Sequence, residues 1–240
     1  MTELLVLQRV SKSFGAVRAA DAVTLSIDAG LVLGVIGPNG AGKTTLFNLI
    51  GGDLRPDAGT IRFRDDDITG LPPHERCRRG IGRSYQIPHP FGGMTVFENL
   101  LVAAAFGGRL GERAAYPVCL EVLESTGLAA RANRLAGSLT LLDRKRLELA
   151  RALSTRPELL LLDEIAGGLT EAESTELVAL LGRIKQRGVA MIWIEHVVHA
   201  LIAVADRLLV MNFGATLAEG SPAAVMADPE VQRVFLGIEA

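Results

Sequence analysis

Residues 37–45, GPNGAGKTT, have the residue types and spacing of a phosphate-binding loop. They fit the pattern G-x-x-x-x-G-K-[ST], with an apolar segment of strand length before them and a helix-compatible segment after them. Glycines let backbone N–H groups face a β-phosphate, the lysine reaches the β- and γ-phosphate oxygens, and the hydroxyl of Thr44 ligates Mg²⁺. A glycine-rich turn with an incidental lysine is the plainer alternative. The expected ATP-binding residues of this loop are Gly37, Asn39, Gly40, Gly42, Lys43, Thr44 and Thr45.

A second acidic segment, LLLLDE at residues 159–164, supplies what a metal–nucleotide site needs next. Four leucines predict a buried central strand, with Asp163 and Glu164 at its carboxyl end. We expect Asp163 to lie in the metal's coordination shell. Glu164, facing the other way along the strand, is expected to act as the general base on an attacking water. An ordinary acidic strand end is the alternative reading.

The elements that must position these residues alternate along the chain. Apolar runs at 31–37, 159–163, 189–195 and 207–212 have strand length and are separated by segments of helix length. This pattern predicts an α/β fold with a mostly parallel sheet covered on both faces. Between about 87 and 146 helical patterns dominate, with Thr95 and Glu98 spaced as a capping box and Pro117 expected in the first turn of a helix.

Composition excludes several classes of protein. The 240 residues are 49% hydrophobic and carry a formal charge of −2, which argues against a polybasic nucleic-acid binder. Cys77 and Cys119 predict neither a disulfide framework nor a metal site. The N-terminus lacks a signal-peptide pattern, and charged or histidine residues interrupt the longest apolar segment, 189–205. We therefore expect a soluble chain in a reducing compartment, whose contact with a membrane comes through a partner.

The order of motifs resembles the ATP-binding cassette (ABC) family over nearly the whole chain. After the phosphate loop come Gln86 in SYQ, LELARAL at 147–153, LLLLDE and then His196 in IEH. The resemblance implies a P-loop NTPase (RecA-like) core with a mainly parallel sheet, an N-terminal antiparallel β part and an inserted helical subdomain. It implies one nucleotide-binding domain, 1–240, with a core lobe at about 1–86 and 147–240 and a helical lobe at about 87–146.

The resemblance also implies roles for single residues in ATP hydrolysis. Phe14, in SKSFG, falls where the family stacks an aromatic ring on adenine, and a core phenylalanine is the alternative. Gln86 would contact Mg²⁺ and the attacking water and carry movement to the helical lobe. His196 would contact the γ-phosphate and hold Glu164. The expected catalytic residues are thus Glu164, His196 and Gln86, and the expected metal ligands are Thr44, Gln86 and Asp163.

Narrower features resemble the ATPase subunits of branched-chain amino acid importers. These are the runs at 43–52 and 83–103 and the ending EGSPAAVMADPEVQRVFLG at 219–237, after which no regulatory domain follows. The resemblance implies two ATPase subunits beneath two membrane permease subunits, fed by a solute-binding protein, on the cytoplasmic face of the plasma (inner) membrane. Cassettes for urea, short amides, aromatic acids or lipopolysaccharide export share much of this pattern. Residues 88–91 are expected to line the groove that couples to the permeases.

One segment departs from the family. Residues 139–143, LTLLD, stand where the family has LSGGQ, the motif that closes over the nucleotide of the partner ATPase. Thr140 can replace the serine hydroxyl, whereas Leu141 and Leu142 need room for side chains that glycine lacks. We expect Asp143 to cap the following helix and point away from nucleotide. Thr170 stands where many relatives have Asp or Asn. These departures predict a heteromeric pair in which this subunit's own ATP is hydrolysed better, unless LTLLD is a tolerated variant.

Two rival functions remain open. The segment HERCRRGIGR, 74–83, would suit a cassette that acts on nucleic acid, although a solvated basic face explains it more simply and no nucleic-acid partner is expected. A nucleotide-binding regulatory subunit with weak turnover is the second rival, and the presence of Glu164 and His196 disfavours it.

Overall fold

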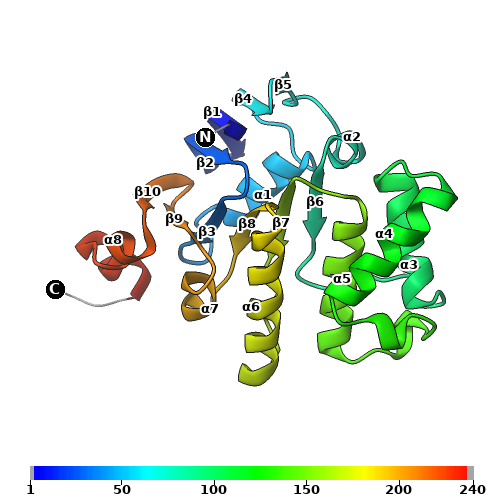
Figure 1. The fold of residues 1–240 in the computed structure, drawn as a ribbon. Helices are drawn as coiled ribbons and strands as arrows, with labels where there is room; N and C mark the ends of the chain where they lie inside the picture. Colours follow the sequence, from blue (N-terminus) through cyan, green and yellow to red (C-terminus); the bar gives the residue numbers. More distant parts are fainter. Residues whose placement is uncertain (1–2, 237–240) are drawn as a thin grey trace.

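The structure, a computed structural model, describes residues 3–236 and is an α/β fold built on two sheets, as predicted (Figure 1). Residues 1–2 and 237–240, the ends of the expected 1–240 domain and of the 219–237 run, lie outside the described part. In Figure 1 the helical lobe lies to one side of the six-stranded sheet, and the smaller antiparallel sheet lies at the top.

The larger sheet has the order β10-β9-β3-β8-β7-β6. Its strands are β3 Val32–Ile36, β6 Ile81–Ser84, β7 Leu159–Asp163, β8 Ala190–Ile194, β9 Arg207–Asn212 and β10 Ala215–Gly220. The four predicted apolar runs are β3, β7, β8 and β9, which lie next to one another in the sheet. All pairings from β9 to β6 are parallel, and only β10 pairs antiparallel. The carboxyl ends of five strands therefore meet at one edge.

The smaller sheet is antiparallel and has the order β2-β1-β4-β5. Its strands are β1 Glu3–Phe14, β2 Val17–Asp28, β4 Ala58–Phe63 and β5 Asp66–Asp67. Alternate residues of β1, such as Leu5 and Leu7, are fully buried in the core beneath it. This sheet confirms the expected N-terminal antiparallel part.

Helices and the second sheet cover the two faces of the large sheet. Leu159 and Leu161 of β7 pack into a core with α1 and the antiparallel sheet, whereas Leu160 and Leu162 pack into a core with α6 and α7. This alternation follows from the two-residue period of a strand, and each buried leucine contributes about 1.5–3 kcal/mol. The helices outside the helical lobe are α1 Lys43–Gly51, α2 Pro73–Arg78, α6 Glu171–Gln186, α7 Val198–Ile202, α8 Pro222–Met226, α9 Pro229–Val231 and a π-helical turn Gln232–Leu236.

The helical lobe has its own apolar core, which includes Val96, Leu100, Val118 and Leu147. Its elements are α3 Val96–Val102, a π-helical turn Ala103–Gly107, α4 Glu112–Ser125, the 3₁₀ turns Ala129–Arg131 and Ala136–Ser138, and α5 Leu141–Ser154. Thr95 caps α3 through the predicted capping box with Glu98. No helix among residues 3–236 has the length and apolar character needed to cross a bilayer.

Two details of the helical lobe differ from the sequence-based expectation. The expected boundary at about 146 falls inside α5, whose Leu147 packs in the helical-lobe core while Leu149 packs in the core of the large sheet. The start of α4 at Pro117 is also wrong, because the helix begins at Glu112 and Pro117 lies inside it. The proline costs one intrahelical hydrogen bond there, and the buried face of α4 continues across it.

Candidate nucleotide-binding site

Four loops that carry the predicted site residues meet at the carboxyl edge of the large sheet. The glycine-rich loop follows β3, Gln86 follows β6, Asp163 and Glu164 end β7, and His196 follows β8. The sheet order places β3, β8, β7 and β6 side by side, so residues from distant parts of the sequence face one pocket. That pocket is lined by Ala19, Asn39, Gly40, Ala41, Gly42, Lys43, Thr44, Thr45, Glu164 and His196.

The glycine-rich loop needs glycine for its close contacts. Gly42 has φ of +100°, and a Cβ there would lie 2.2 Å from the carbonyl oxygen of Ala19. The buried ammonium of Lys43 turns back over the loop and donates to the carbonyl oxygens of Gly37 at 2.7 Å and Pro38 at 3.0 Å. Burial lowers the pKa of Lys43. The loop therefore binds the ammonium of Lys43, the first residue of α1, through two of its carbonyl oxygens.

A left-handed turn sets the direction of Glu164. The strand β7 ends at Asp163, and Glu164 adopts φ of +46° while its N–H donates to the carbonyl oxygen of Ile194 on β8 at 2.9 Å. The expectation that Glu164 simply alternates along the strand is therefore wrong. Non-glycine residues in this region carry strain of about 1–3 kcal/mol, which is typical of functional sites.

The carboxylate of Glu164 is the meeting point of the three predicted catalytic residues. Its Oε2 accepts a hydrogen bond from Nε2 of Gln86 at 2.5 Å, and its Oε1 lies 2.9 Å from Nε2 of His196. Gln86 and His196 are exposed and Glu164 is partly buried; His196 and Glu164 line the pocket, whereas Gln86 does not. The arrangement orients a carboxylate over the glycine-rich loop, where it can accept a proton from a water beside a bound phosphate.

The three expected metal ligands come from three elements: Thr44 from the start of α1, Gln86 from the segment after β6 and Asp163 from the end of β7. Asp163 is buried, and its desolvation raises the pKa of its carboxyl, although Nη2 of Arg83 lies 3.9 Å away. The amide of Gln86 is already bound to Glu164. Within residues 3–236 no three acidic, histidine or cysteine side chains form a cluster that could hold a metal ion. A hydroxyl, one carboxylate and one amide suit Mg²⁺ when phosphate oxygens and waters complete its octahedron.

Phe14 lies apart from the phosphate loop. It ends β1 with its ring half exposed and 5.8 Å from Nζ of Lys12, and it does not line the pocket. Ala19, on the following strand, does line it. The ring is therefore not a core residue, and a ligand that touches it must extend beyond the phosphate loop.

Two charged residues behind the site were missed in the sequence. Glu195 is buried at the end of β8, and its carboxylate accepts backbone N–H groups of Ala166 and His196, each at 3.0 Å. It fixes the turn after β7 to the turn that carries the histidine. Lys145 is buried on α5 and reaches the carbonyl oxygen of Glu164 at 3.5 Å. The position of Glu195 directly before His196 was a signal in the sequence that could have indicated its role. Lys145, one of several charged residues in a helical segment, gave no such signal.

The departing segment 139–143 forms the N-terminus of α5. Thr140 is the N-cap and accepts the N–H of Asp143 at 3.3 Å, so the expectation that Asp143 caps the helix is wrong. The Asp143 carboxylate is buried and paired with Arg131 at 2.7 Å and Arg146 at 3.6 Å. Leu142 is buried, whereas Leu141 is 46% exposed and lies against Gly168.

Thr170 and the basic segment have structural tasks. Thr170 caps α6 through a capping box with Glu173, a task that Asp or Asn can also perform. Arg76 is buried and donates to the carbonyl oxygens of Leu49 and Ile50, which end α1. Burial lowers the pKa of Arg76 to about 10, so it stays charged at neutral pH.

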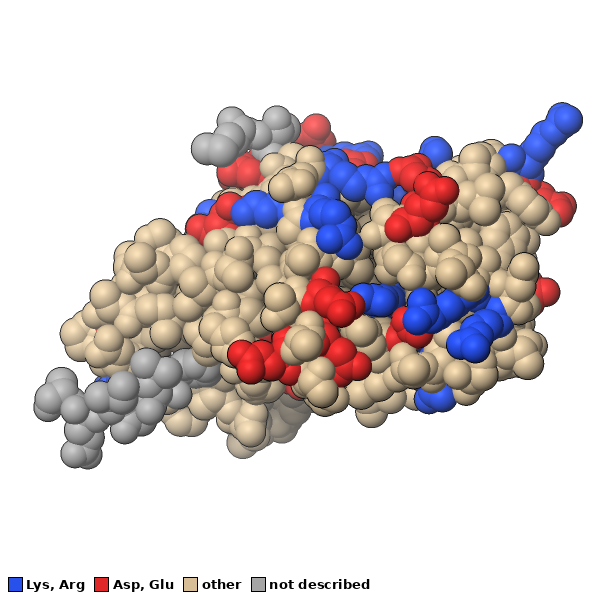
Figure 2. All heavy atoms as spheres, turned by 60° about the horizontal axis from the view of Figure 1, so that its bottom comes forward, with Lys and Arg blue, Asp and Glu red and all other residues tan. Residues whose placement is uncertain are grey.

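The basic segment is therefore not simply a solvated basic face. Arg83 binds Asp53 and Asn48, and Arg78 and Arg79 pair with Glu75. On the face shown in Figure 2, basic and acidic side chains are interspersed and form no single basic stripe.

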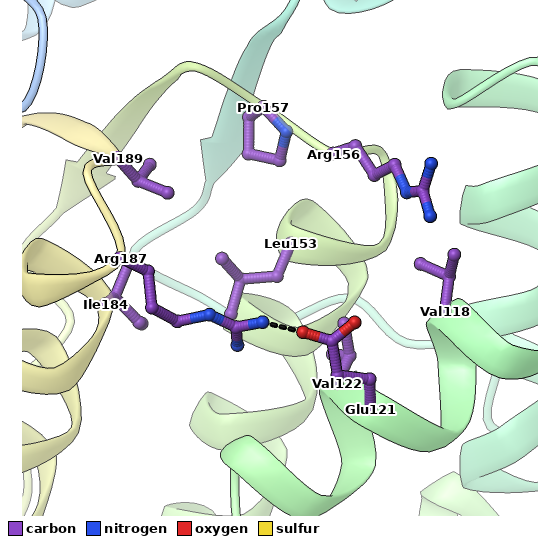
Figure 3. A pocket seen from close by; sticks show the side chains of 9 residues that line it. All are labelled: Val118, Glu121, Val122, Leu153, Arg156, Pro157, Ile184, Arg187 and Val189. Atoms are coloured by element: carbon purple, nitrogen blue, oxygen red, sulfur yellow. Dashed lines mark ion pairs between the residues drawn. The ribbon is translucent and has the colours of Figure 1, made fainter.

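A second pocket lies at the opposite edge of the sheet, between the helical lobe and the core (Figure 3). Its lining comes from α4, the end of α5 with the loop after it, and the end of α6 with the loop that leads to β8. Arg187 and Glu121 form an ion pair across it, and its floor is apolar, with Val122, Leu153 and Ile184. It has no carboxylate aimed at a phosphate loop and is a contact between lobes.

The fold and this site define a P-loop ATPase with an inserted helical lobe. Residues 20–167 match the family model described as ABC transporter, and residues 215–240 match one described as branched-chain amino acid ATP-binding cassette transporter. The chain is 37% identical over 251 residues to the high-affinity branched-chain amino acid transport ATP-binding protein BraF of Pseudomonas aeruginosa, covering 98% of each. It is 32% identical over 233 residues to the lipopolysaccharide export system ATP-binding protein LptB of Escherichia coli, covering 97% of each.

A solved structure agrees over the whole length. The ADP conformation of MJ1267, an ATP-binding cassette of an ABC transporter, has a TM-score of 0.88 and 32% identity, covering 99% of this chain and 100% of that one. The chain belongs to the ABC transporter family, as the ATPase subunit that binds and hydrolyses ATP to power transport. Its partners are therefore membrane permease subunits.

Proposed function

We propose that this chain hydrolyses ATP for an importer of branched-chain or other hydrophobic amino acids. Two observations support the solute class: the match of residues 215–240 to the branched-chain amino acid family, and the name of the relative with 37% identity. Lipopolysaccharide export is the second candidate, supported by a relative with the lower identity of 32%.

The observation that carries the hydrolytic role is the carboxylate of Glu164, held from two sides by Gln86 and His196 over the glycine-rich loop. Glu164 is the general base, and His196 orients it and contacts the γ-phosphate. The nucleotide phosphates lie on residues 37–45, where Lys43 leaves the loop carbonyls to pair with them. Phe14 contacts the adenine beyond the pocket.

Thr44, Asp163 and Gln86 would hold a Mg²⁺ ion that binds with the nucleotide, and the ion would neutralise charge on the β- and γ-phosphates. The desolvation that raises the pKa of Asp163 is offset when a cation pairs with the carboxylate, because an opposite charge favours the ionised form. Gln86 must then divide its amide between Glu164 and the metal site.

The assembly we propose has two ATPase subunits, two permease subunits and a solute-binding protein that acts indirectly, on the cytoplasmic face of the membrane. The ATPase pair is heteromeric. Leu141 stands where the family has a glycine, and its side chain is 46% exposed. We expect this side chain to hinder the approach of the α5 N-terminus to the partner's γ-phosphate, because glycine has no side chain there. The nucleotide bound by this chain, facing the partner's signature motif, is the better hydrolysed of the two.

ATP turnover tests the proposal when measured for this chain alone and with its co-encoded ATPase and permease subunits. We expect stimulation on assembly, abolished by Glu164→Gln, and uptake of labelled leucine into vesicles. ATP binding without turnover in every assembly would contradict the hydrolytic role. Equal loss of turnover from Glu→Gln changes in either ATPase subunit would contradict the asymmetric pair, and release of lipopolysaccharide in place of leucine uptake would support the second candidate.

A further inference from the structure

The segment 86–91 joins the nucleotide site to the helical lobe. It begins at Gln86, whose amide is bound to Glu164, and leads through His89 and Phe91 toward α3. Its far end is fixed by the buried Asn99 of α3, which accepts the N–H of Phe91 at 2.8 Å and donates to its carbonyl oxygen at 3.2 Å. Any displacement of Gln86 by a nucleotide must therefore be taken up between residues 86 and 91.

Arg151 ties the middle of this segment to α5. Its Nη1 donates to the carbonyl oxygen of His89 at 3.0 Å, and its guanidinium carbon lies 5.2 Å from the centre of the Phe91 ring. Both contacts cross from a helix to a segment about 60 positions earlier in the sequence, one as a hydrogen bond and one as a cation–π contact. A lysine has no guanidinium fork, so it could make the hydrogen bond but not both contacts together.

Glu148 holds this guanidinium in place. Its Oε2 lies 2.8 Å from Nη1 of Arg151, one helical turn away, and the carboxylate is buried. Burial raises the pKa of Glu148, while Arg151 acts in the opposite direction. Nε of Arg151 is buried and has no hydrogen-bond partner within residues 3–236. A buried ion pair with an unsatisfied hydrogen-bond donor contributes little to stability, so stability alone does not explain the pairing of Glu148 with Arg151.

The helix that Arg151 belongs to supplies that explanation. α5 starts at Leu141, directly after Thr140, so the surface presented to a second ATPase and the residue that grips segment 86–91 are on one rigid element. Lys145, between them, contacts the carbonyl oxygen of Glu164. Movement of segment 86–91 would pull on α5 through Arg151 and shift its N-terminus.

We propose that Arg151, positioned by Glu148, couples the state of Gln86 to the N-terminus of α5, and so links nucleotide binding in this subunit to the surface that faces its partner. This inference rests on the proposed function only for the identity of that partner. Arg151 touches neither nucleotide nor reacting atoms and is a positioning residue.

Hydrogen exchange on the isolated full chain tests the coupling without partner subunits. The exchange of amides in residues 86–91 and 139–147 is followed with and without AMP-PNP and Mg²⁺. The proteins are wild type, Arg151→Met, Arg151→Lys and a matched control, Arg183→Met. The side chain of Arg183 on α6 is exposed and has no hydrogen bond or ion pair among the described residues. We expect the ligand to change exchange in both segments in wild type and control. In Arg151→Met the change at 86–91 remains and that at 139–147 is lost, with partial recovery in Arg151→Lys.

The assembled transporter gives a second readout. Arg151→Met should lower permease-stimulated turnover by about tenfold, within the range of coupling effects between sites, while basal turnover and the KM for ATP stay within about twofold. Ligand-dependent exchange at 139–147 that persists in Arg151→Met would overturn the inference, as would equal losses of basal and stimulated turnover in a variant with unchanged thermal stability. Absence of permease stimulation in wild type would instead contradict the proposed function, and the exchange experiment would still decide the role of Arg151.

Discussion

Nε2 of His196 lies 2.9 Å from Oε1 of Glu164, although the two residues are 32 positions apart in the sequence. Their approach follows from the parallel pairing of β7 with β8, which aligns Asp163 with Ile194 and brings the residues just beyond both strand ends together. Gln86 approaches the other carboxylate oxygen from the end of β6, the next strand in the sheet. Each oxygen of the Glu164 carboxylate therefore has its own partner from a different strand end.

Glu164→Gln should abolish steady-state turnover while ATP still binds. Loss of a general base costs about 10²- to 10⁴-fold in kcat, and the amide can keep the contacts to Gln86 and His196. Single-turnover kinetics and equilibrium binding of ATP measure the two effects separately. A parallel loss of binding would contradict the assignment of Glu164 to the chemical step.

Lys43→Met should weaken ATP binding by about tenfold to a hundredfold, because one charge-assisted contact to phosphate contributes about 1.5–3 kcal/mol. The same change leaves the carbonyl oxygens of Gly37 and Pro38 without their donor, so the loop should also lose order. Isothermal titration with ATP and Mg²⁺ gives the affinity. Arg183→Met is the matched control, and equal affinities in the two variants would exclude a phosphate role for Lys43.

The sequence was sufficient for those parts of the fold and site that local patterns encode. The apolar runs of β7 and β9 predicted both strands with their bounds, and the spacing of Thr95 and Glu98 predicted a capping box. The glycine-rich loop was recognisable because its chemistry depends on consecutive residues. Each of these features needs only neighbouring positions.

Features that depend on tertiary contacts could not be found this way. The burial of Arg76 beneath the end of α1, the paired Asp143 and the contact of Arg151 with His89 all join distant segments. Pro117 was misplaced because packing of α4 outweighs the local cost of an interior proline. In each case the deciding energy comes from a partner that the local sequence does not contain.

Leu141→Gly and Leu142→Gly should separate function from stability. Leu142 is buried, so its loss should cost about 3–5 kcal/mol from the cavity and the helical glycine. Leu141 is exposed at the helix start, so Leu141→Gly should cost about 1 kcal/mol or less. If Leu141 obstructs the partner's nucleotide, that variant alone should raise turnover at the partner's site. Urea unfolding measures the stability of each variant. Turnover is measured in an ATPase pair in which this chain also carries Glu164→Gln, so that the signal comes from the partner's site.

Asp143→Asn should destabilise the helical lobe, because it removes the charge that pairs with Arg131 and Arg146. The buried carboxylate forms ion pairs with two guanidinium groups, and leaving these partners without the charge should cost about 1–3 kcal/mol. Glu176→Gln, which removes an exposed partner of the same Arg146, should change the free energy of unfolding by about 1 kcal/mol or less. Equal effects of the two changes would show that the Asp143 pairing is not a stabilising contact.

Glu173 at the start of α6 should make stability depend on pH in the acid range. Its carboxylate accepts the backbone N–H of Thr170 at 2.9 Å and its hydroxyl at 2.9 Å, and these hydrogen bonds lower the pKa of Glu173 below its ordinary value of 4.5. A lowered folded-state pKa means that the unfolded chain binds a proton more readily. The stabilisation is therefore fully present above pH 4.5 and is lost as the pH falls through the lowered pKa. Glu173→Gln keeps the capping geometry but not the charge, so its midpoint of unfolding should be lower than that of wild type at neutral pH and should approach it on acidification. A difference that stays constant across this range would show that the charge at Glu173 does not act on the helix.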